Sequence, residues 1–176
     1  MPILKDHYSR IVSLDTKITW ELNLIKNKSL DYCPNREDYL NWIPFEFILK
    51  IGEDESYIFP KEYGATFSLE ELKSLFAGME DLFREIKARD VTIEEEFKKD
   101  LFFDLYTLET YFNVKFRDGY DGLMGVQIWI HMGAIPNSNE GGFKRGFEFV
   151  ASLIEVEQFI SELNEQFKDL LDNWNK

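Results

Sequence analysis

Residues 67–89, FSLEELKSLFAGMEDLFREIKAR, carry the clearest structural pattern in the chain. Ser68 is suited to cap a helix N-terminus. Glu71, three residues later, can accept a hydrogen bond from the backbone amide of the cap, which completes a capping box. Apolar residues then recur every three or four positions, as on one face of a helix: Leu69, Leu72, Leu75, Phe76, Met79, Leu82, Phe83 and Ile86. This segment is therefore predicted to be a helix that packs one face on a sheet.

The end of the chain repeats this pattern. Residues 155–175 place apolar side chains at the same helical spacing: Val156, Phe159, Ile160, Leu163, Phe167, Leu170, Leu171 and Trp174. A second amphipathic helix is predicted there, and its apolar spacing is comparable to that of the first.

Strands are predicted wherever apolar and polar residues alternate. Such runs lie at residues 17–24, 42–51, 56–59, 106–116, 123–132 and 143–150. The polar turn at 117–122, with two glycines, makes 106–132 the strongest hairpin signal. Residues 90–105 are predicted to contain a short helix. The expected fold class is α+β, with an antiparallel sheet of about six strands and two amphipathic helices packed on one face.

Each half of the chain reads strand, strand, strand, helix. This order suggests a duplication with half-repeats at 17–89 and 106–175, although few residues are identical between the halves. No linker rich in Gly, Ser or Pro separates them, so residues 1–176 are interpreted as a single domain.

Charge and composition exclude several classes of function. The 176 residues contain 33 acidic and 20 basic side chains, a net charge of −13, which repels both nucleic acid and anionic lipid. No apolar run is long enough to cross a bilayer, and the first twelve residues lack the apolar core of a signal peptide. The single cysteine, Cys33, cannot form an internal disulfide and is interpreted as an incidental loop thiol. A cytoplasmic location, and no nucleic-acid or membrane partner, are expected.

No catalytic motif stands out in the sequence. His7 and His131 are far apart, and no serine lies in a nucleophile-elbow context. One cysteine and two histidines are too few for a typical zinc site, and the Asp-Gly segment at 118–122 reads as a turn rather than a calcium loop. Neither a cofactor nor a metal is predicted, and no catalytic residue is named.

The outward face of the predicted sheet is more informative. If the apolar side chains point toward the helices, the alternate positions point away and combine large rings with acids, as protein-binding surfaces do. The predicted protein-binding residues are Glu21, Glu46, Glu109, Tyr111, Trp129 and His131. The alternative is that loops, the N-terminal segment or the second subunit of a homodimer cover these rings.

The order of several short motifs resembles a known family. Asp38, Leu40 and Trp42 open an apolar strand, followed by a Gly-acidic turn, the Ser-Leu-Glu-Glu-Leu helix start at 68–72, the strand LETYFNVKF at 108–116 and the terminal helix. From about residue 17 onward this is similar to the WapI-like immunity proteins of bacterial toxin systems, which neutralise a cognate toxin by binding it. The chain departs from the pattern in the long loop at 133–142 and in lacking a Glu-Pro before the fifth strand.

The resemblance implies a non-catalytic protein that binds a toxin. The acidic net charge further predicts that this partner is basic. Asp38, Leu40 and Trp42 are the only positions carried over from the family, and they are interpreted as structural. Two alternatives stay open: a small enzyme or ligand-binding domain that uses carboxylates, and a homo-oligomeric structural protein in which Trp129 and Tyr111 meet their symmetry mates.

Overall fold

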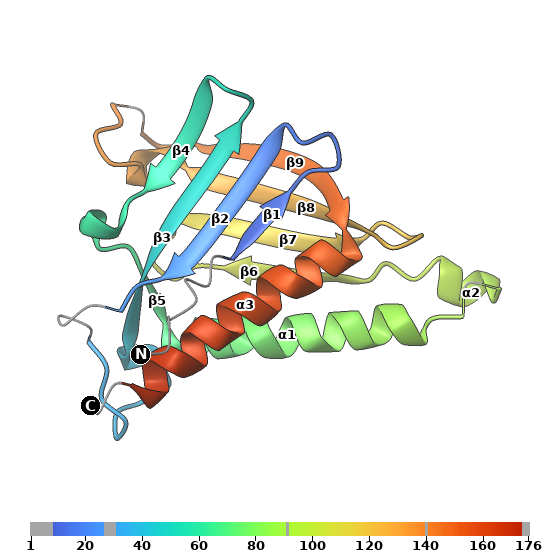
Figure 1. Ribbon diagram of the computed structural model, residues 1–176, viewed down its shortest axis with the longest axis horizontal. Helices are drawn as coiled ribbons and strands as arrows, with labels where there is room; N and C mark the ends of the chain where they lie inside the picture. The colour runs from blue at the N-terminus through green and yellow to red at the C-terminus, as the bar shows by residue number, and fades with distance from the viewer. Residues whose placement is uncertain (1–8, 27–30, 91, 140, 174–176) are drawn as a thin grey trace, which may run out of the picture.

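The computed structural model describes residues 9–26, 31–90, 92–139 and 141–173. These residues form two antiparallel sheets and two long helices (Figure 1). The five-stranded sheet has the order β1-β2-β3-β4, with β5 also paired to β3: β1 Arg10–Val12, β2 Ile18–Leu24, β3 Trp42–Ile51, β4 Glu55–Phe59 and β5 Thr66–Ser68. The four-stranded sheet has the order β6-β7-β8-β9: β6 Phe102–Tyr106, β7 Phe112–Asp118, β8 Leu123–His131 and β9 Lys144–Ser152.

Both predicted helices are present. They are α1, Leu69–Ala88, and α3, Leu153–Asp172, and a single turn, α2, covers Glu94–Phe97. The predicted capping box of α1 is formed: Ser68 Oγ accepts from Glu71 N, and a Glu71 carboxylate oxygen accepts from Ser68 N at 2.6 Å. The Ser152 side chain caps α3 by accepting from Glu155 N at 3.2 Å.

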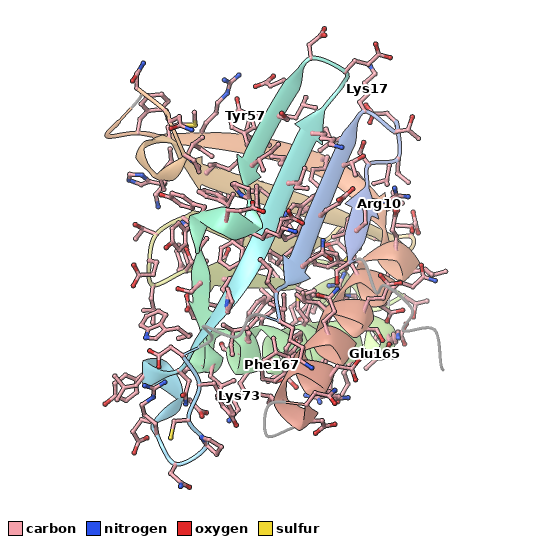
Figure 2. The ribbon with its side chains drawn as sticks, turned by 60° about the vertical axis from the view of Figure 1, so that its left-hand side comes forward. Arg10, Lys17, Tyr57, Lys73, Glu165 and Phe167 are labelled. Atoms are coloured by element: carbon pink, nitrogen blue, oxygen red, sulfur yellow. The ribbon has the colours of Figure 1, made fainter. Side chains whose placement is uncertain are left out.

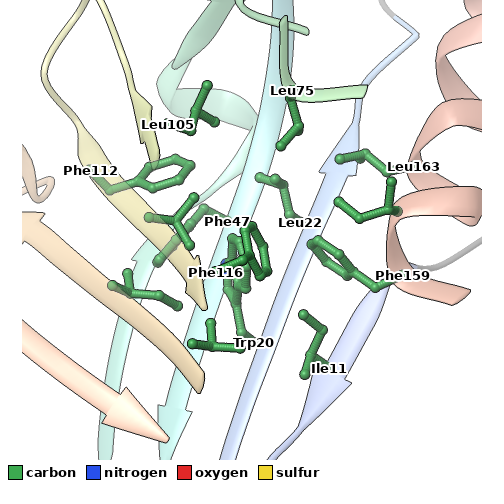
Figure 3. Close-up of a cluster of buried hydrophobic side chains, with 14 of the residues drawn as sticks. Ile11, Trp20, Leu22, Phe47, Leu75, Leu105, Phe112, Phe116, Phe159 and Leu163 are labelled. Atoms are coloured by element: carbon green, nitrogen blue, oxygen red, sulfur yellow. The ribbon is translucent and has the colours of Figure 1, made fainter. Parts of the chain in front are cut away.

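The core lies between the two sheets, which face each other (Figure 3). Trp20 of β2 and Phe47 of β3 meet Phe112 and Phe116 of β7, with 4.8 Å between the ring centroids of Phe47 and Phe112. The α+β class is confirmed, but the strands form two sheets rather than one. Alternation shows that each strand has one apolar face; it does not show which other strand that face packs against.

The helices close one side of this sandwich. Helix α1 packs along β6, and α3 packs along β1 and β2, where Phe159 lies 4.9 Å from Trp20. Gly78 of α1 allows the first contact, because a Cβ at this position would lie 2.1 Å from the ring of Phe103. Helix α3, which ends the second half of the chain, therefore covers edge strand β1 of the five-stranded sheet. Helix α1, which ends the first half, covers edge strand β6 of the four-stranded sheet.

The predicted strand at 106–116 is interrupted. Residues 107–111 form a turn in which Thr107 Oγ1 donates to Phe112 O at 2.8 Å and Thr110 has a φ of 55°. The turn breaks the alternation between β6 and β7. As a result Tyr106 points outward, whereas Tyr111 packs inward against Phe45.

Candidate protein-binding surfaces

The six residues predicted for one binding face lie on different parts of the molecule. Glu21 and Glu46 lie on the outer face of the five-stranded sheet, and Trp129 and His131 lie on the outer face of the four-stranded sheet. The prediction of one shared face is wrong because the strands divide into two sheets whose outer faces point in opposite directions. The part that each residue plays in binding stays a prediction.

The other two predicted residues border the 107–111 turn. Glu109 is exposed in this turn, but Tyr111 is half-buried, with ring centroids 5.8 Å from Phe45 and 5.5 Å from Phe59. Burial raises the pKa of the Tyr111 phenol above its usual value, with the Glu109 charge adding to the effect. Tyr111 therefore belongs to the edge of the core, which corrects its assignment to an outward surface.

The solvent face of α3 is strongly acidic. This helix carries six carboxylates and one basic side chain, Lys168. The carboxylates are Glu155, Glu157, Glu162, Glu165, Asp169 and Asp172. Glu165 points into solvent in Figure 2. Glu155 and Glu157 are engaged by Val12 N and Lys87, and the other four carboxylates give α3 an acidic solvent face.

A polar hollow of about 550 Å³ lies between this helix and the adjoining sheet edge. It is lined by Glu21 of β2, by Arg10 of β1, and by Glu155, Gln158 and Glu162 of α3. Glu155 is held in place because its Oε1 accepts a hydrogen bond from Val12 N at 2.9 Å. Glu21 is among the binding residues predicted from the sequence. The α3 residues beside it could not be predicted, because they lie more than 130 positions from β2 in the chain.

A second hollow, of about 1000 Å³, runs between α1 and α3. Its apolar lining includes Phe76, Phe83 and Ile160, and an ion pair between Lys87 and Glu157 joins the two helices across it. The charged residues on its rim, which also include Glu80 and Arg84, are of both signs.

The outer face of the four-stranded sheet has a different character. Three large apolar side chains on it are well exposed: Phe102 (47%), Tyr106 (66%) and Val150 (41%). The indole of Trp129 lies against Gly146 of the neighbouring strand, where an added Cβ would come within 2.8 Å of Nε1. The sequence does not predict this exposure, because residues 102–105 lie outside the predicted strands, Tyr106 is predicted to point inward, and only the inward positions of 143–150 are assigned.

A comparison with protein families identifies the chain. The model of the WapI-like immunity protein family matches residues 11–171, nearly the whole length. The chain belongs to the WapI-like immunity protein family. This confirms the resemblance found in the sequence. A comparison with curated proteins and a comparison with solved structures each give no match.

The motif that suggested the family has a structural place in this WapI-like protein. Asp38 Oδ2 accepts from Lys73 Nζ of α1 at 2.6 Å, and Trp42 begins β3 opposite Ser68, the cap of α1. Between them, Asn41 is buried, and its Oδ1 accepts from Cys33 N at 2.7 Å. The motif thus connects the loop before β3 to the N-terminal part of α1, through the Asp38–Lys73 ion pair and the pairing of Trp42 with Ser68.

In the described part of this WapI-like chain, no group of three or more His, Cys, Asp or Glu side chains is arranged to hold a metal ion. Over the same residues, no helix combines the length and the apolar character needed to cross a membrane. Cys33 is exposed, as expected for a loop thiol.

Proposed function

We propose that this protein neutralises a bacterial toxin by binding it, without catalysing a reaction. The observation that carries the proposal is the family match over residues 11–171. We further propose that it acts in the cytoplasm, where its one cysteine would stay reduced.

The toxin surface that it covers is, in this proposal, basic. The net charge of −13 and the row of carboxylates on α3 support this view, because opposite charge accelerates association and orients the partners. The hollow beside α3, with Glu21 and Glu162, could accept a protruding lysine or arginine of the toxin. Binding by this surface would weaken as the salt concentration rises.

Coexpression with the reading frame immediately upstream of this gene, as the candidate toxin, tests the proposal. The wild-type chain should rescue growth and copurify with the toxin. Replacing Glu162 and Glu165 by lysine should lower the association rate at least about tenfold, because like charges would then face each other.

A matched double variant controls for net charge. Glu53→Lys with Asp54→Lys makes the same charge change in the exposed β3–β4 turn, away from α3 (Figure 1). This control should bind the toxin as the wild type does. Absence of toxin binding by the wild type would contradict the proposed function, whereas equal losses in both variants would contradict only the assignment to α3.

One observation favours a second candidate, a carboxylate-dependent enzyme or ligand-binding protein. The hollow beside α3 brings together Glu21, Glu155 and Glu162. A reaction that needs the Glu162 carboxylate would be abolished by Glu162→Gln, since the amide cannot transfer the same proton. Immunity that depends on the overall electrostatic field should tolerate this change, so full growth protection by Glu162→Gln would argue against an enzyme that uses Glu162.

A further inference from the structure

The outer face of the four-stranded sheet combines exposed aromatic rings with balanced charge. The outer face of the five-stranded sheet, in contrast, carries mainly polar residues such as Thr19, Asn23 and Ser56. Both faces are outward faces of antiparallel sheets in one molecule. The difference therefore lies in their residues and not in the architecture.

Charges on the four-stranded sheet cancel locally. Lys115 lies 3.7 Å from Asp104 and 3.9 Å from the ring centroid of Phe102, and Arg117 lies 2.6 Å from Asp100. Lys144 Nζ donates to Asn113 at 2.9 Å when the amide of Asn113 is turned so that its nitrogen donates to Phe112 O. The outward positions of β6 to β9 carry two carboxylates, Asp104 and Glu148, and three cations, Lys115, Arg117 and Lys144, while Asp100 just before β6 pairs with Arg117. Such a surface has little net field with which to attract a basic partner.

From this balance we infer that the four-stranded sheet face, defined by β6 to β9, docks against the same face of a second copy of this chain. Two copies that each carry a charge of −13 repel one another over most of their surfaces. The repulsion is smallest where charges cancel, and apolar rings supply the attraction there.

The arrangement of side chains is also self-complementary. With a two-fold axis parallel to the strands, β6 of one copy lies opposite β9 of the other. Phe102 then faces Val150, and Tyr106 faces the flat surface that Trp129 forms over Gly146. The two rings of β6 at one edge thus meet an aliphatic side chain and a flat surface at the other.

The size of the face sets the expected strength. Four strands about 4.8 Å apart and roughly seven residues long cover about 400–500 Å² in each copy. The two copies together would bury about 800–1,000 Å², at the lower limit for a specific interface. The dimer is therefore expected to be weak and dependent on concentration.

Sedimentation equilibrium of the full-length chain, from about 1 µM to 1 mM, tests the inference. The mass should rise from monomer to dimer, and added NaCl should strengthen the dimer, because salt screens the repulsion between the acidic copies. Val150→Glu and Tyr106→Glu should each raise the Kd at least about tenfold.

Ile58→Glu is the matched control. Ile58 is 38% exposed on the outer face of edge strand β4, as Val150 is 41% exposed on edge strand β9. This variant should leave the Kd within about twofold of wild type.

Circular dichroism checks the fold of each variant, and if Val150→Glu is unfolded, Tyr106→Glu decides the test. A chain that stays monomeric throughout, a dimer that salt weakens, or equal effects of Ile58→Glu and Tyr106→Glu would each overturn the inference. Loss of toxin binding by Tyr106→Glu in a monomeric protein would likewise overturn it, by assigning the face to the toxin.

Discussion

The two long helices, α1 and α3, end the two halves of the chain in similar ways but are anchored differently. Each follows a strand directly, each is capped by a serine, and each has a glutamate at the third helical position, Glu71 or Glu155. Each glutamate accepts a hydrogen bond from the backbone of the other half, from Leu108 N in the first case and from Val12 N in the second. These two bonds join the N-terminal and C-terminal parts of the chain, while the duplication and the single domain stay predictions.

The difference lies in burial. Glu71 is buried and accepts from both Ser68 N and Leu108 N, whereas Glu155 is half-buried beside the acidic hollow. At its C-terminal end α1 is followed by Arg89, which forms a buried ion pair with Asp118 of β7. Helix α3 is followed by Asn173, whose side-chain amide only donates back to Asp169 O of the same helix. Helix α1 is thus anchored to the rest of the fold at both ends. Helix α3 keeps a charged face exposed to solvent.

The largest expected effect is at the C-terminal anchor of α1. The Arg89 and Asp118 side chains are only 4% and 6% exposed, with Nη1 2.5 Å from Oδ2. The contact is ionic, because neither Nη1 nor Nε has a hydrogen-bond partner among the described residues. Asp118→Asn leaves the guanidinium buried without a counter-charge and should lower the free energy of unfolding by about 3–5 kcal/mol, measured by urea denaturation.

Asp100→Asn is the control for this prediction. Asp100 and Arg117 also form an ion pair, but both side chains are 50% exposed, so its loss should cost no more than about 1 kcal/mol. Similar losses in the two variants would show that the burial of the first pair does not matter.

The N-terminal anchor of α1 is expected to show the next largest effect. Glu71→Gln keeps one acceptor oxygen and places an NH₂ group against a backbone N–H, so one buried donor loses its partner. The free energy of unfolding should fall by about 2–3 kcal/mol, measured by urea denaturation. The exposed neighbour Glu70 provides a control, and Glu70→Gln should stay within about 0.5 kcal/mol of wild type.

The corresponding anchor of α3 should be weaker. Glu155→Gln disturbs one hydrogen bond at a half-exposed position, where water can replace the lost contact, so a loss of about 1 kcal/mol is expected in the same assay. Glu162→Gln removes the same charge from α3 and serves as the control. If Glu155→Gln costs as much as Glu71→Gln, burial does not explain the difference between the helices.

The smallest effect concerns the side of the sandwich that lacks helices. There Tyr57 of β4 packs 5.0 Å from Phe147 of β9 and donates to Glu55, which lies 2.9 Å from Arg145. Burial, assisted by the hydrogen bond to Glu55, raises the pKa of Tyr57 from 10.0 to about 12. Because the unfolded chain releases this proton first, the stabilisation is complete below about pH 10 and is lost as the pH rises toward 12.

Between about pH 9 and pH 11 this group should lower the free energy of unfolding by about 1 kcal/mol. The measurement is the difference between wild type and Tyr57→Phe across that range, since the other tyrosines contribute equally to both proteins. Parallel pH profiles for the two proteins would contradict the assigned pKa.

Local patterns predicted much of the fold. The strand at 42–51 was predicted with the bounds of β3, and the capping box of α1 is formed as expected. Strands β1 and β5 were not predicted because three residues are too few to show alternation. Strand β6 was not predicted because most of its residues fall in the 90–105 stretch, where a short helix is predicted. The turn at 107–111 was also missed, since it depends on Thr107 and on a positive φ at Thr110, which alternation does not reveal.

The sequence by itself determined the two amphipathic helices, their serine caps, most strands and the family, because these depend on residues close together in the chain. Only the tertiary structure decided that the strands form two facing sheets, which separates Glu21 from Trp129 and turns Tyr111 inward. It also decided that Glu71 and Glu155 each reach the opposite half. Burial of a side chain and the partners of its polar atoms depend on contacts between distant segments, and periodicity along one segment carries no information about them.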